Sequence, residues 1–492
     1  MTTASTHIQA LPPLWRNFWF IAALLTALRV ATLNFTPLGI GPDEAQYWYW
    51  SRDFDFGYFS KPPLIAWAIG ITTSMFGDGA WAVRLSAPLF HFGAAAFLFA
   101  AAKRAFDART AFWAGLTWLL MPGVVLSSFI MATDAPLLFF WSAALYLLLR
   151  IIDSPRASYA DFARLGAVIG LGMMSKYAMI YFPVAMGLCL LLKRLREKLL
   201  RPHLLLTALI ALAIFAPNMI WNAQHEFQTL SHTAANANWS EDLFKPLNLL
   251  EFIGGQFAVF GVISFPALIW IAVNRRALKF NQTDLTLLIF SVTPLLVVAA
   301  QAFLSRAHAN WAAAAYPAAC LLVVSLLLRH GKPLLVKLNA GVNAAFFLAF
   351  TCGVLAPALI DSAGLAGAAK DLRGWKAQTT EIMSYVAGYD AVLVDDRYLM
   401  GEMLYHQQNS AVEIAAIDPN ASIDNHFEAF RGFDPARMKR VLFVTTRDDA
   451  AHVDYRFRNI APVAVVEAAP GRDQHRRYTL YELSEYFGPG VD

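Results

Sequence analysis

The residues best suited to chemistry are a few carboxylates at the edges of long apolar stretches. Asp43 and Glu44 follow Pro42 in the segment GIGPDEAQYWYW, where a helix is expected to begin. Asp134 begins a later apolar run in the segment MATDAPLLFF. A carboxylate within hydrogen-bonding reach of a hydroxyl can accept its proton as a new bond forms. Capping the start of a helix is the alternative role for each of these acidic residues.

Two lysines lie at the same edges and are suited to holding a phosphate. Lys61 precedes Pro62 and Pro63, which favour an extended and stiff backbone, so its ammonium is expected to have a fixed position. Lys176 lies in a tight turn, MMSKYAM, between two short apolar runs. The alternatives are a lysine that reaches out to lipid headgroups for Lys61 and an ordinary turn lysine for Lys176.

Three further residues are candidates for substrate binding. Tyr47 shares a helix face with Asp43, because the two positions are four residues apart. Arg29 lies inside the first apolar run, where a lone cation needs a carboxylate or phosphate partner. Asp43, Asp134 and a ligand phosphate are all possible partners. Arg306 lies at the end of a later apolar run.

Composition places these residues in a membrane protein. The 492 residues are 58% hydrophobic and 15% charged, with a mean hydropathy of +0.46. Soluble domains contain more charge and less apolar surface, so a soluble enzyme is excluded. The three cysteines show no metal-ligand spacing, and neither do His225, Glu226, His232 and His308. We therefore expect no cofactor and no structural zinc site, and leave the question of a divalent metal open.

Apolar runs long enough to cross a bilayer recur through the first 360 residues. A spanning helix needs about 20 apolar residues, and eleven runs approach that length, two of them short. They lie at about 17–34, 82–102, 111–130, 134–150, 163–175, 177–192, 204–222, 251–273, 284–303, 309–328 and 338–360. The sequence therefore predicts about eleven transmembrane helices.

The distribution of Lys and Arg predicts the orientation. With the N-terminus inside, 18 basic residues fall in the inner connections and six in the outer ones. Short cytoplasmic loops carry such an excess. The outer six are Arg52, Lys61, Arg84, Lys176, Lys245 and Arg306, so most of the candidate residues lie on the outer side. The outer loops 35–81 and 221–250 are long, and long loops often carry function.

The chain changes character near residue 360. Residues 1–360 contain 25 Lys and Arg against 15 Asp and Glu, whereas residues 361–492 contain 14 against 20. Short strand-like runs at 391–394, 440–445, 463–466 and 478–483 follow a helical stretch at 374–387. We expect a membrane domain over 1–360 and a small, extracytoplasmic α/β domain over 361–492.

The order of these motifs resembles the GT-C superfamily of membrane glycosyltransferases. The motifs are Asp43-Glu44 followed by aromatic residues, Lys61-Pro62-Pro63, and Thr133-Asp134 at the head of the fourth span. WN...H at 221–225 and HANW at 308–311 also look like segments of this superfamily. The chain is most similar to the group of bacterial protein O-mannosyltransferases and lipid A aminoarabinose and galacturonic acid transferases.

The resemblance implies a GT-C fold and an inverting transfer of a sugar from a polyprenyl-phosphate donor to an extracytoplasmic acceptor. Lipid A is the expected acceptor. The enzyme is expected in the bacterial inner membrane, and nucleic acid is not expected as a partner. Asp43 would be the catalytic carboxylate and Asp134 a second acidic residue of the cavity. Lys61 would bind the lipid phosphate, and the outer loops 35–81 and 221–250 would form the roof of the site.

Glu44, Lys176, Arg29, Arg306 and Tyr47 would bind substrate in the same interpretation. Gln46 and Ser60 depart from the aminoarabinose transferases, which have Arg and Glu there, so the donor sugar is left open. A protein O-mannosyltransferase activity is the alternative within the family. A transporter or lipid flippase is the alternative outside it, although these tend to bind ligands at the midplane.

Overall fold

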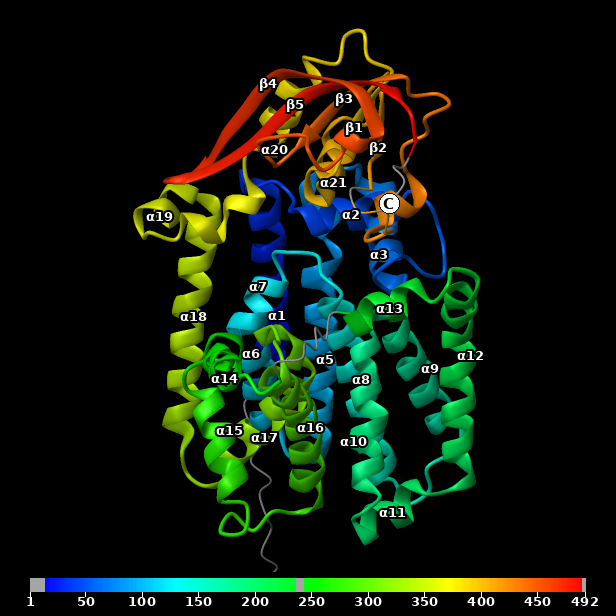
Figure 1. Cartoon of the computed structure of the whole chain (residues 1–492). Coiled ribbons are helices and arrows are strands. Elements are labelled where there is room, and N and C mark those ends of the chain that lie inside the picture. The colour runs from blue at the N-terminus through cyan, green and yellow to red at the C-terminus, as the bar shows by residue number, and fades with distance from the viewer. Residues whose placement is uncertain (1–13, 236–242, 419, 421, 489–492) are drawn as a thin grey trace, which may run out of the picture.

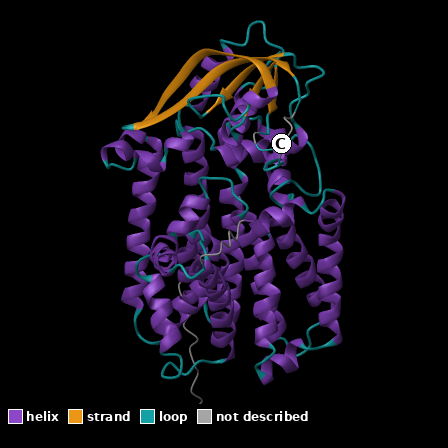
Figure 2. Cartoon of the chain, in the orientation of Figure 1, coloured by secondary structure: helices purple, strands orange, loops and turns teal. Residues whose placement is uncertain are grey.

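A long helical bundle with a sheet-containing part at one end makes up the protein (Figures 1 and 2). The computed structural model describes residues 14–235, 243–418, 420 and 422–488. The bundle begins with α1 (Leu14–Phe35), α2 (Pro42–Trp50), α3 (Leu64–Phe76), α4 (Ala80–Arg84), α5 (Ser86–Ala105), α6 (Ala108–Leu120), α7 (Pro122–Ser127), α8 (Asp134–Asp153) and α9 (Tyr159–Ser175). It continues with η1 (Tyr177–Ile180), α10 (Tyr181–Cys189), α11 (Lys193–Leu199), α12 (Pro202–Gln224), α13 (Gln228–Ala235), α14 (Pro246–Phe260), α15 (Ser264–Val273), α16 (Gln282–Leu304), η2 (Ala309–Ala315), α17 (Tyr316–Arg329), α18 (Pro333–Leu355) and α19 (Pro357–Ser362).

Seven described helices are long and apolar enough to cross a membrane, and nine if each of two bent helix pairs forms one span. The expected class of polytopic helical membrane protein is therefore confirmed, but the count of eleven spans is not. The run at 111–130 is broken at Pro122 into α6 and α7, because proline lacks the N–H that would continue the helix. Helix α9, which contains the predicted run at 163–175, has 17 residues and is shorter than the about 20 that a spanning helix needs.

The run at 251–273 is not one straight span. Helices α14 and α15 meet at an angle of 116°. Gly261 ends α14 with a φ of 103°, a conformation that residues with a Cβ rarely adopt. Hydropathy predicts the apolar character of this segment but not the sharp bend at Gly261.

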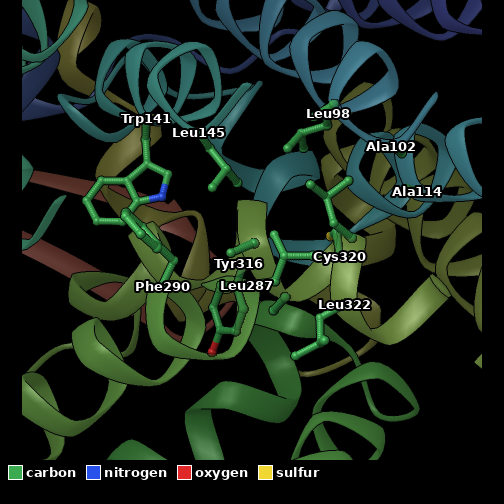
Figure 3. Close-up of a cluster of buried hydrophobic side chains, with 14 of the residues drawn as sticks. Leu98, Ala102, Ala114, Trp141, Leu145, Leu287, Phe290, Tyr316, Cys320 and Leu322 are labelled. Atoms are coloured by element: carbon green, nitrogen blue, oxygen red, sulfur yellow. The ribbon is translucent and has the colours of Figure 1, made fainter. Parts of the chain in front are cut away.

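Close packing holds the bundle together around α5, α6, α8, α16 and α17. Trp141, Leu145, Phe290, Tyr316 and Cys320 are among the buried side chains of this core (Figure 3). The Tyr316 and Phe260 rings stack with centroids 4.4 Å apart. Helix α17 is buried along most of its length, so it forms the centre around which the outer helices pack.

The C-terminal part is an α/β domain, as predicted. After η3 (Ala366–Ala368) and η4 (Lys370–Leu372) it contains α20 (Trp375–Met383), β1 (Ala391–Val394), α21 (Arg397–His406), β2 (Glu413–Ala416), α22 (His426–Phe430), β3 (Arg440–Thr445), η5 (Asp454–Arg456), β4 (Phe457–Gly471) and β5 (Gln474–Tyr486). The strand order is β2-β1-β3-β5-β4. Strands β2, β1 and β3 are parallel, and β5 pairs antiparallel with both β3 and β4.

Strands β1 and β3 have the predicted bounds, and the runs at 463–466 and 478–483 fall inside the longer β4 and β5. Strand β2 was not predicted. The apolar residues of β1 are buried on both faces, since one hydrophobic cluster lies on each side of the sheet.

The domain sits on the head of the bundle through α21, which packs directly on α2 (Figure 1). A Cβ on Gly401 of α21 would lie 3.5 Å from the Cβ of Ala45 on α2, so the two helices are in close contact. The basic helix α11 and the connection between α15 and α16 lie at the opposite end of the bundle (Figure 1).

Candidate functional site

Helix α2 presents its two acidic residues to different surroundings. It begins at Pro42, and its aromatic residues Tyr47, Trp48 and Trp50 are buried against neighbouring elements. The Asp43 side chain is 62% exposed. The Glu44 side chain is only 1% exposed. The neighbouring carboxylates therefore differ in role, since only the first is open to a ligand.

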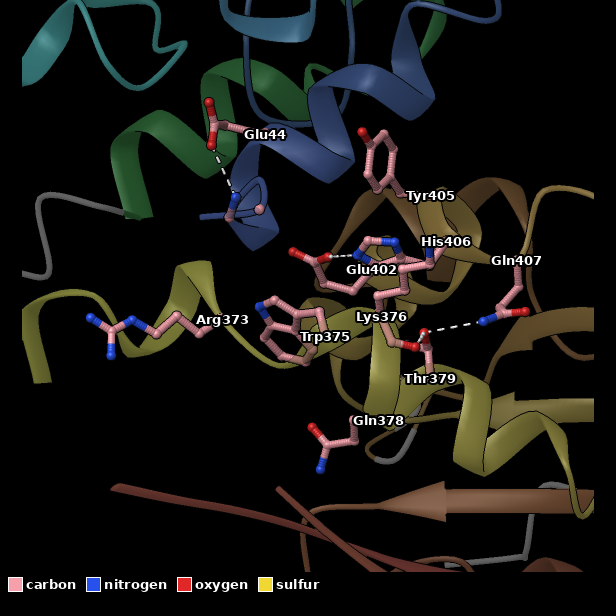
Figure 4. A network of polar contacts seen from close by, with 12 residues as sticks. Glu44, Arg373, Trp375, Lys376, Gln378, Thr379, Glu402, Tyr405, His406 and Gln407 are labelled. Carbon is pink, nitrogen blue, oxygen red and sulfur yellow. Dashed lines mark hydrogen bonds and ion pairs between the residues drawn. The ribbon is translucent and has the colours of Figure 1, made fainter. Parts of the chain in front are cut away.

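Glu44 forms a buried ion pair that fixes α2 to the bundle. Its carboxylate accepts hydrogen bonds from Arg84 Nε at 2.8 Å and Arg84 Nη2 at 2.5 Å. It also accepts the backbone N–H of Gly41 at 2.9 Å, shown in Figure 4, and of Met131 at 2.8 Å. Because the Glu44 side chain is almost fully buried and is held by these donors, it fixes α2 in place.

Asp43 is paired with a cation from the C-terminal domain. Arg397, the first residue of α21, donates from Nη1 to Asp43 Oδ1 at 3.0 Å and to Gln46 Oε1 at 3.2 Å. Arg397 is 37% exposed. The two domains therefore meet at the exposed carboxylate of α2.

Lys61 lies beside this pair on a rigid corner. Its backbone forms an isolated antiparallel bridge with Tyr58, and Pro62 and Pro63 follow it into α3. Burial, and then repulsion by Lys176, lowers the pKa of the half-buried Lys61 ammonium. The ammonium forms no ion pair with any residue in the described ranges. A bound anion would offset the burial and the repulsion, and so favour the charged form of Lys61.

Asp134 is held by two side chains from other elements. Its Oδ1 lies 2.8 Å from the Lys176 ammonium, and its Oδ2 accepts a hydrogen bond from Asn310 Nδ2 at 3.2 Å. The alternative of helix capping is not supported, because Thr133 is the N-cap of α8 and makes no capping hydrogen bond. Lys176 is accordingly an ion-pair partner and not an ordinary turn lysine.

Charges from both loops and both domains converge at this site. The groups that act electrostatically on Lys61 are Lys176, Asp43, Asp134 and Arg397. His232 on α13 belongs to the same group, because burial and then Lys61 and Arg397 lower its pKa to about 4. His232 is therefore neutral at pH 7 and does not add to the positive charge.

The Tyr47 side chain is buried, and the same charges act on its phenol. Its ring is 7% exposed, and burial followed by the charge of Asp43 raises its pKa well above the ordinary value. The Tyr47 phenol is therefore neutral at pH 7.

The sequence and fold of the chain identify its relatives. A family model described as dolichyl-phosphate-mannose-protein mannosyltransferase matches residues 60–221. Lipid A galacturonosyltransferase RgtD of Rhizobium johnstonii is 32% identical over 435 residues, which is 87% of this chain and 91% of the relative. This chain belongs to the GT-C glycosyltransferases of the ArnT/PMT-like group. It is therefore a multi-pass membrane transferase, as the resemblance of its motifs predicts.

Solved structures share the fold of this GT-C enzyme. ArnT from Cupriavidus metallidurans bound to undecaprenyl phosphate has a TM-score of 0.67 at 17% identity, covering 96% of this chain and 99% of that one. Its apo structure has a TM-score of 0.65 at 16% identity, covering 95% and 97%. The archaeal oligosaccharyltransferase AglB from Archaeoglobus fulgidus has a TM-score of 0.53 at 14% identity, covering 87% and 69%. The expected GT-C fold is confirmed.

In the GT-C enzyme the loop between α2 and α3 is joined to the end of α12. Trp221 Nε1 donates to Asp55 Oδ2 at 2.6 Å, and Asn218 Nδ2 donates to the Phe56 carbonyl at 2.7 Å. Gly57 lies so close to Trp221 that a Cβ would come within 2.4 Å of the indole ring. The loop that carries Lys61 is therefore fixed against the end of α12.

Arg29 lies elsewhere in the GT-C enzyme, inside α1. It donates to the carbonyl of Leu119 at the end of α6 and lies over the Phe347 ring. The last carbonyls of a helix have no partner within it, so the arginine caps the break between α6 and α7. Asp43 and Asp134 are not its partners. The structure therefore does not bring Arg29 to the other candidates.

Among the residues that the structure describes, Arg306 and Arg52 form no hydrogen bond or ion pair with the other candidate residues. Arg306 is exposed in the connection between α16 and η2. Arg52 forms an ion pair with Asp78 at 3.1 Å and lies over the Trp48 ring. Within the described ranges, no three or more His, Cys, Asp and Glu side chains are grouped so that they could hold a metal ion.

Arg397 is the site residue that the sequence analysis missed. It follows the predicted strand 391–394 by three residues, in the segment VLVDDRY. Ligands of α/β domains bind at the carboxyl ends of the parallel strands, and that rule was the available signal. The side chain was not singled out because its partner, Asp43, is 354 residues away in the chain.

Proposed function

We propose that this GT-C enzyme transfers a sugar, galacturonic acid by similarity to its relative, from a polyprenyl-phosphate donor to lipid A. The observation that carries the proposal is an open carboxylate, Asp43, in one cluster with a half-buried ammonium, Lys61, that has no ion-pair partner among the described residues. The relative is named a lipid A galacturonosyltransferase. A solved structure of the same fold carries undecaprenyl phosphate.

In the proposed reaction, an acceptor oxygen attacks the anomeric carbon of the sugar from the face opposite the phosphate. Its proton passes to Asp43 as the new bond forms, and the bond from the anomeric carbon to the phosphate oxygen breaks. The phosphate leaves with the bonding electrons, and the ammonium of Lys61 stabilises its growing charge. The configuration at the anomeric carbon is inverted. Asp134, paired with Lys176, belongs to the same cluster of charges.

Purified enzyme tests the function directly. It should release polyprenyl phosphate from the galacturonic acid donor when lipid A is present and form glycosylated lipid A, detected by mass spectrometry. Transfer of mannose to a peptide with no transfer to lipid A would instead support the O-mannosyltransferase alternative. Release from none of a set of polyprenyl-phosphate sugars would contradict the proposal.

Lys61 gives a more specific test. Lys61→Ala removes a charge-assisted contact, so kcat/KM should fall by about 10- to 150-fold, the equivalent of about 1.5 to 3 kcal/mol. Much of the loss should appear in kcat, because the phosphate gains charge in the transition state. Lys61→Arg should recover only part of the activity, since the guanidinium is larger and planar.

The matched control is Lys439→Ala, which removes an exposed lysine of the C-terminal domain whose ammonium donates to the Pro435 carbonyl. This variant should behave like the wild type. Equal kinetics for Lys61→Ala and the control would indicate that Lys61 merely reaches lipid headgroups.

We further propose that the enzyme lies in the bacterial inner membrane with its site, its outer loops and residues 361–492 on the periplasmic side. Residues 1–360 then form the catalytic membrane domain, and loops 35–81 and 221–250 roof the site. The basic residues of α11 and of the connection between α15 and α16 support this orientation, since both lie at the end opposite the sheet (Figure 1).

Reporter fusions test this orientation. Alkaline phosphatase should be active when joined after residue 361 or within 221–250 and inactive within 193–203. A fluorescent protein that matures only in the cytoplasm should give the reverse pattern. Cytoplasmic fluorescence from the fusion after residue 361 would overturn the proposed orientation.

A further inference from the structure

The C-terminal domain directs the carboxyl edge of its parallel strands at the membrane site. Strand β1 ends at Val394, Asp396 caps α21 through the Leu399 N–H at 2.7 Å, and Arg397 follows in the first turn. Ligand-binding residues of α/β domains gather at this edge. Arg397 is therefore placed as a binding residue of this domain would be, although its surroundings belong to the membrane domain.

Only part of the Arg397 guanidinium is occupied. Nη1 makes both hydrogen bonds, to Asp43 and to Gln46. Nε and Nη2 make none with the residues that the structure describes, and the side chain is 37% exposed. A guanidinium presents its donors in a planar fork that matches a carboxylate. One edge of this fork is therefore available to an anionic group of a ligand.

Lys61 and the open edge of the Arg397 guanidinium leave two cationic groups for two different anions. Lys176 is already paired with Asp134, whereas Lys61 has no ion-pair partner in the described ranges. A uronic acid linked to a polyprenyl phosphate carries one negative charge on the phosphodiester and one on the sugar carboxylate. Lys61 and Arg397 belong to one cluster of charges, because the charge of Arg397 acts on Lys61 and both act on His232.

We propose that Arg397 is a specificity-determining residue that binds the carboxylate of the donor sugar while Lys61 binds the donor phosphate. This inference rests on the proposed function of the enzyme. The anchor of Arg397 on Asp43 and Gln46 would then set the distance between the sugar carboxylate and the residue that accepts the proton. The competing role is that Arg397 only positions Asp43, in which case the sugar substituent would not matter.

Two donors that differ at one carbon separate these roles. Polyprenyl phosphate galacturonic acid carries a carboxylate where polyprenyl phosphate galactose carries a hydroxymethyl group. Arg397→Gln should lower kcat/KM for the galacturonic acid donor by about 10- to 150-fold, the usual cost of a lost charged hydrogen bond. Because Arg397 also contacts Asp43, the galactose donor should lose some activity, but several-fold less, so the preference for the galacturonic acid donor should fall. Arg397→Lys should give an intermediate loss, because it keeps the charge without the fork.

Arg437→Gln is the matched control, because Arg437 is an exposed arginine of the same domain that pairs only with Glu413 and Asp434. It should leave both donors unchanged, and thermal unfolding should show that Arg397→Gln is folded. An equal loss with both donors, or no loss with the galacturonic acid donor, would overturn the inference. Failure of the proposed function is distinguishable, since wild-type enzyme would then release polyprenyl phosphate from neither donor.

Discussion

Asp43→Asn is expected to reduce sugar transfer by about 10²- to 10⁴-fold, the usual contribution of a positioned general base. The amide keeps the shape of the side chain but cannot accept a proton from the acceptor hydroxyl. Folding should be unaffected, because the ion pair between Asp43 and Arg397 is largely exposed, and such pairs contribute little to stability. Release of polyprenyl phosphate under single-turnover conditions is the measurement.

Asp53→Asn is the control for this variant. Asp53 is an exposed carboxylate of the loop that follows α2, and its amide should leave the rate unchanged. Thermal unfolding in detergent should give the same midpoint for both variants and the wild type. Turnover by Asp43→Asn close to that of the wild type would remove Asp43 from the proton-transfer step.

Arg84→Met is expected to destabilise the enzyme by about 3 to 5 kcal/mol, the cost of leaving a buried charge without its partner. Both side chains of the Glu44–Arg84 pair are 1% exposed, so water cannot replace the lost guanidinium. The free energy of unfolding, followed by denaturant titration in detergent micelles, should fall accordingly. Activity should also fall, since Glu44 fixes the helix that carries Asp43.

Two further variants distinguish this explanation from a loss of packing. The double variant Arg84→Met with Glu44→Gln should recover part of the stability, because it removes the unpaired charge. Arg52→Met breaks an ion pair with Asp78 whose side chains are 38% and 34% exposed, so it should cost far less. A double variant no more stable than Arg84→Met alone would contradict the electrostatic explanation.

Local patterns predicted much of this structure. The bounds of β1 and β3 follow from short apolar runs that are buried on both faces, and Lys61 lies on a corner that two prolines define. Hydropathy located the apolar segments but did not show that Pro122 breaks one and Gly261 bends another. Hydropathy averaged over a window of residues measures how favourably a segment transfers to lipid. A break in the helix depends instead on the backbone conformation of one residue.

The roles of the charged candidates depended on contacts between distant segments. The resemblance implied that Asp43 is catalytic and that Glu44 binds substrate, but Glu44 is paired with Arg84 and Asp43 with Arg397. The partners of Asp134 come from η2 and from the turn before η1. No periodicity or local composition carries this information, because each partner is brought close only by the completed fold.

The contact between Asp43 and Arg397 also determines when the site can form during synthesis of the chain. The ribosome makes α2 early, but the arginine that completes its site emerges 354 residues later. Strand β5, near the end of the chain, must then pair with β3 before the α/β domain is whole. A nascent enzyme held in the translocation machinery thus lacks one wall of its site. The site that the structure shows is therefore complete only after translation has finished and the last domain has folded on the bundle.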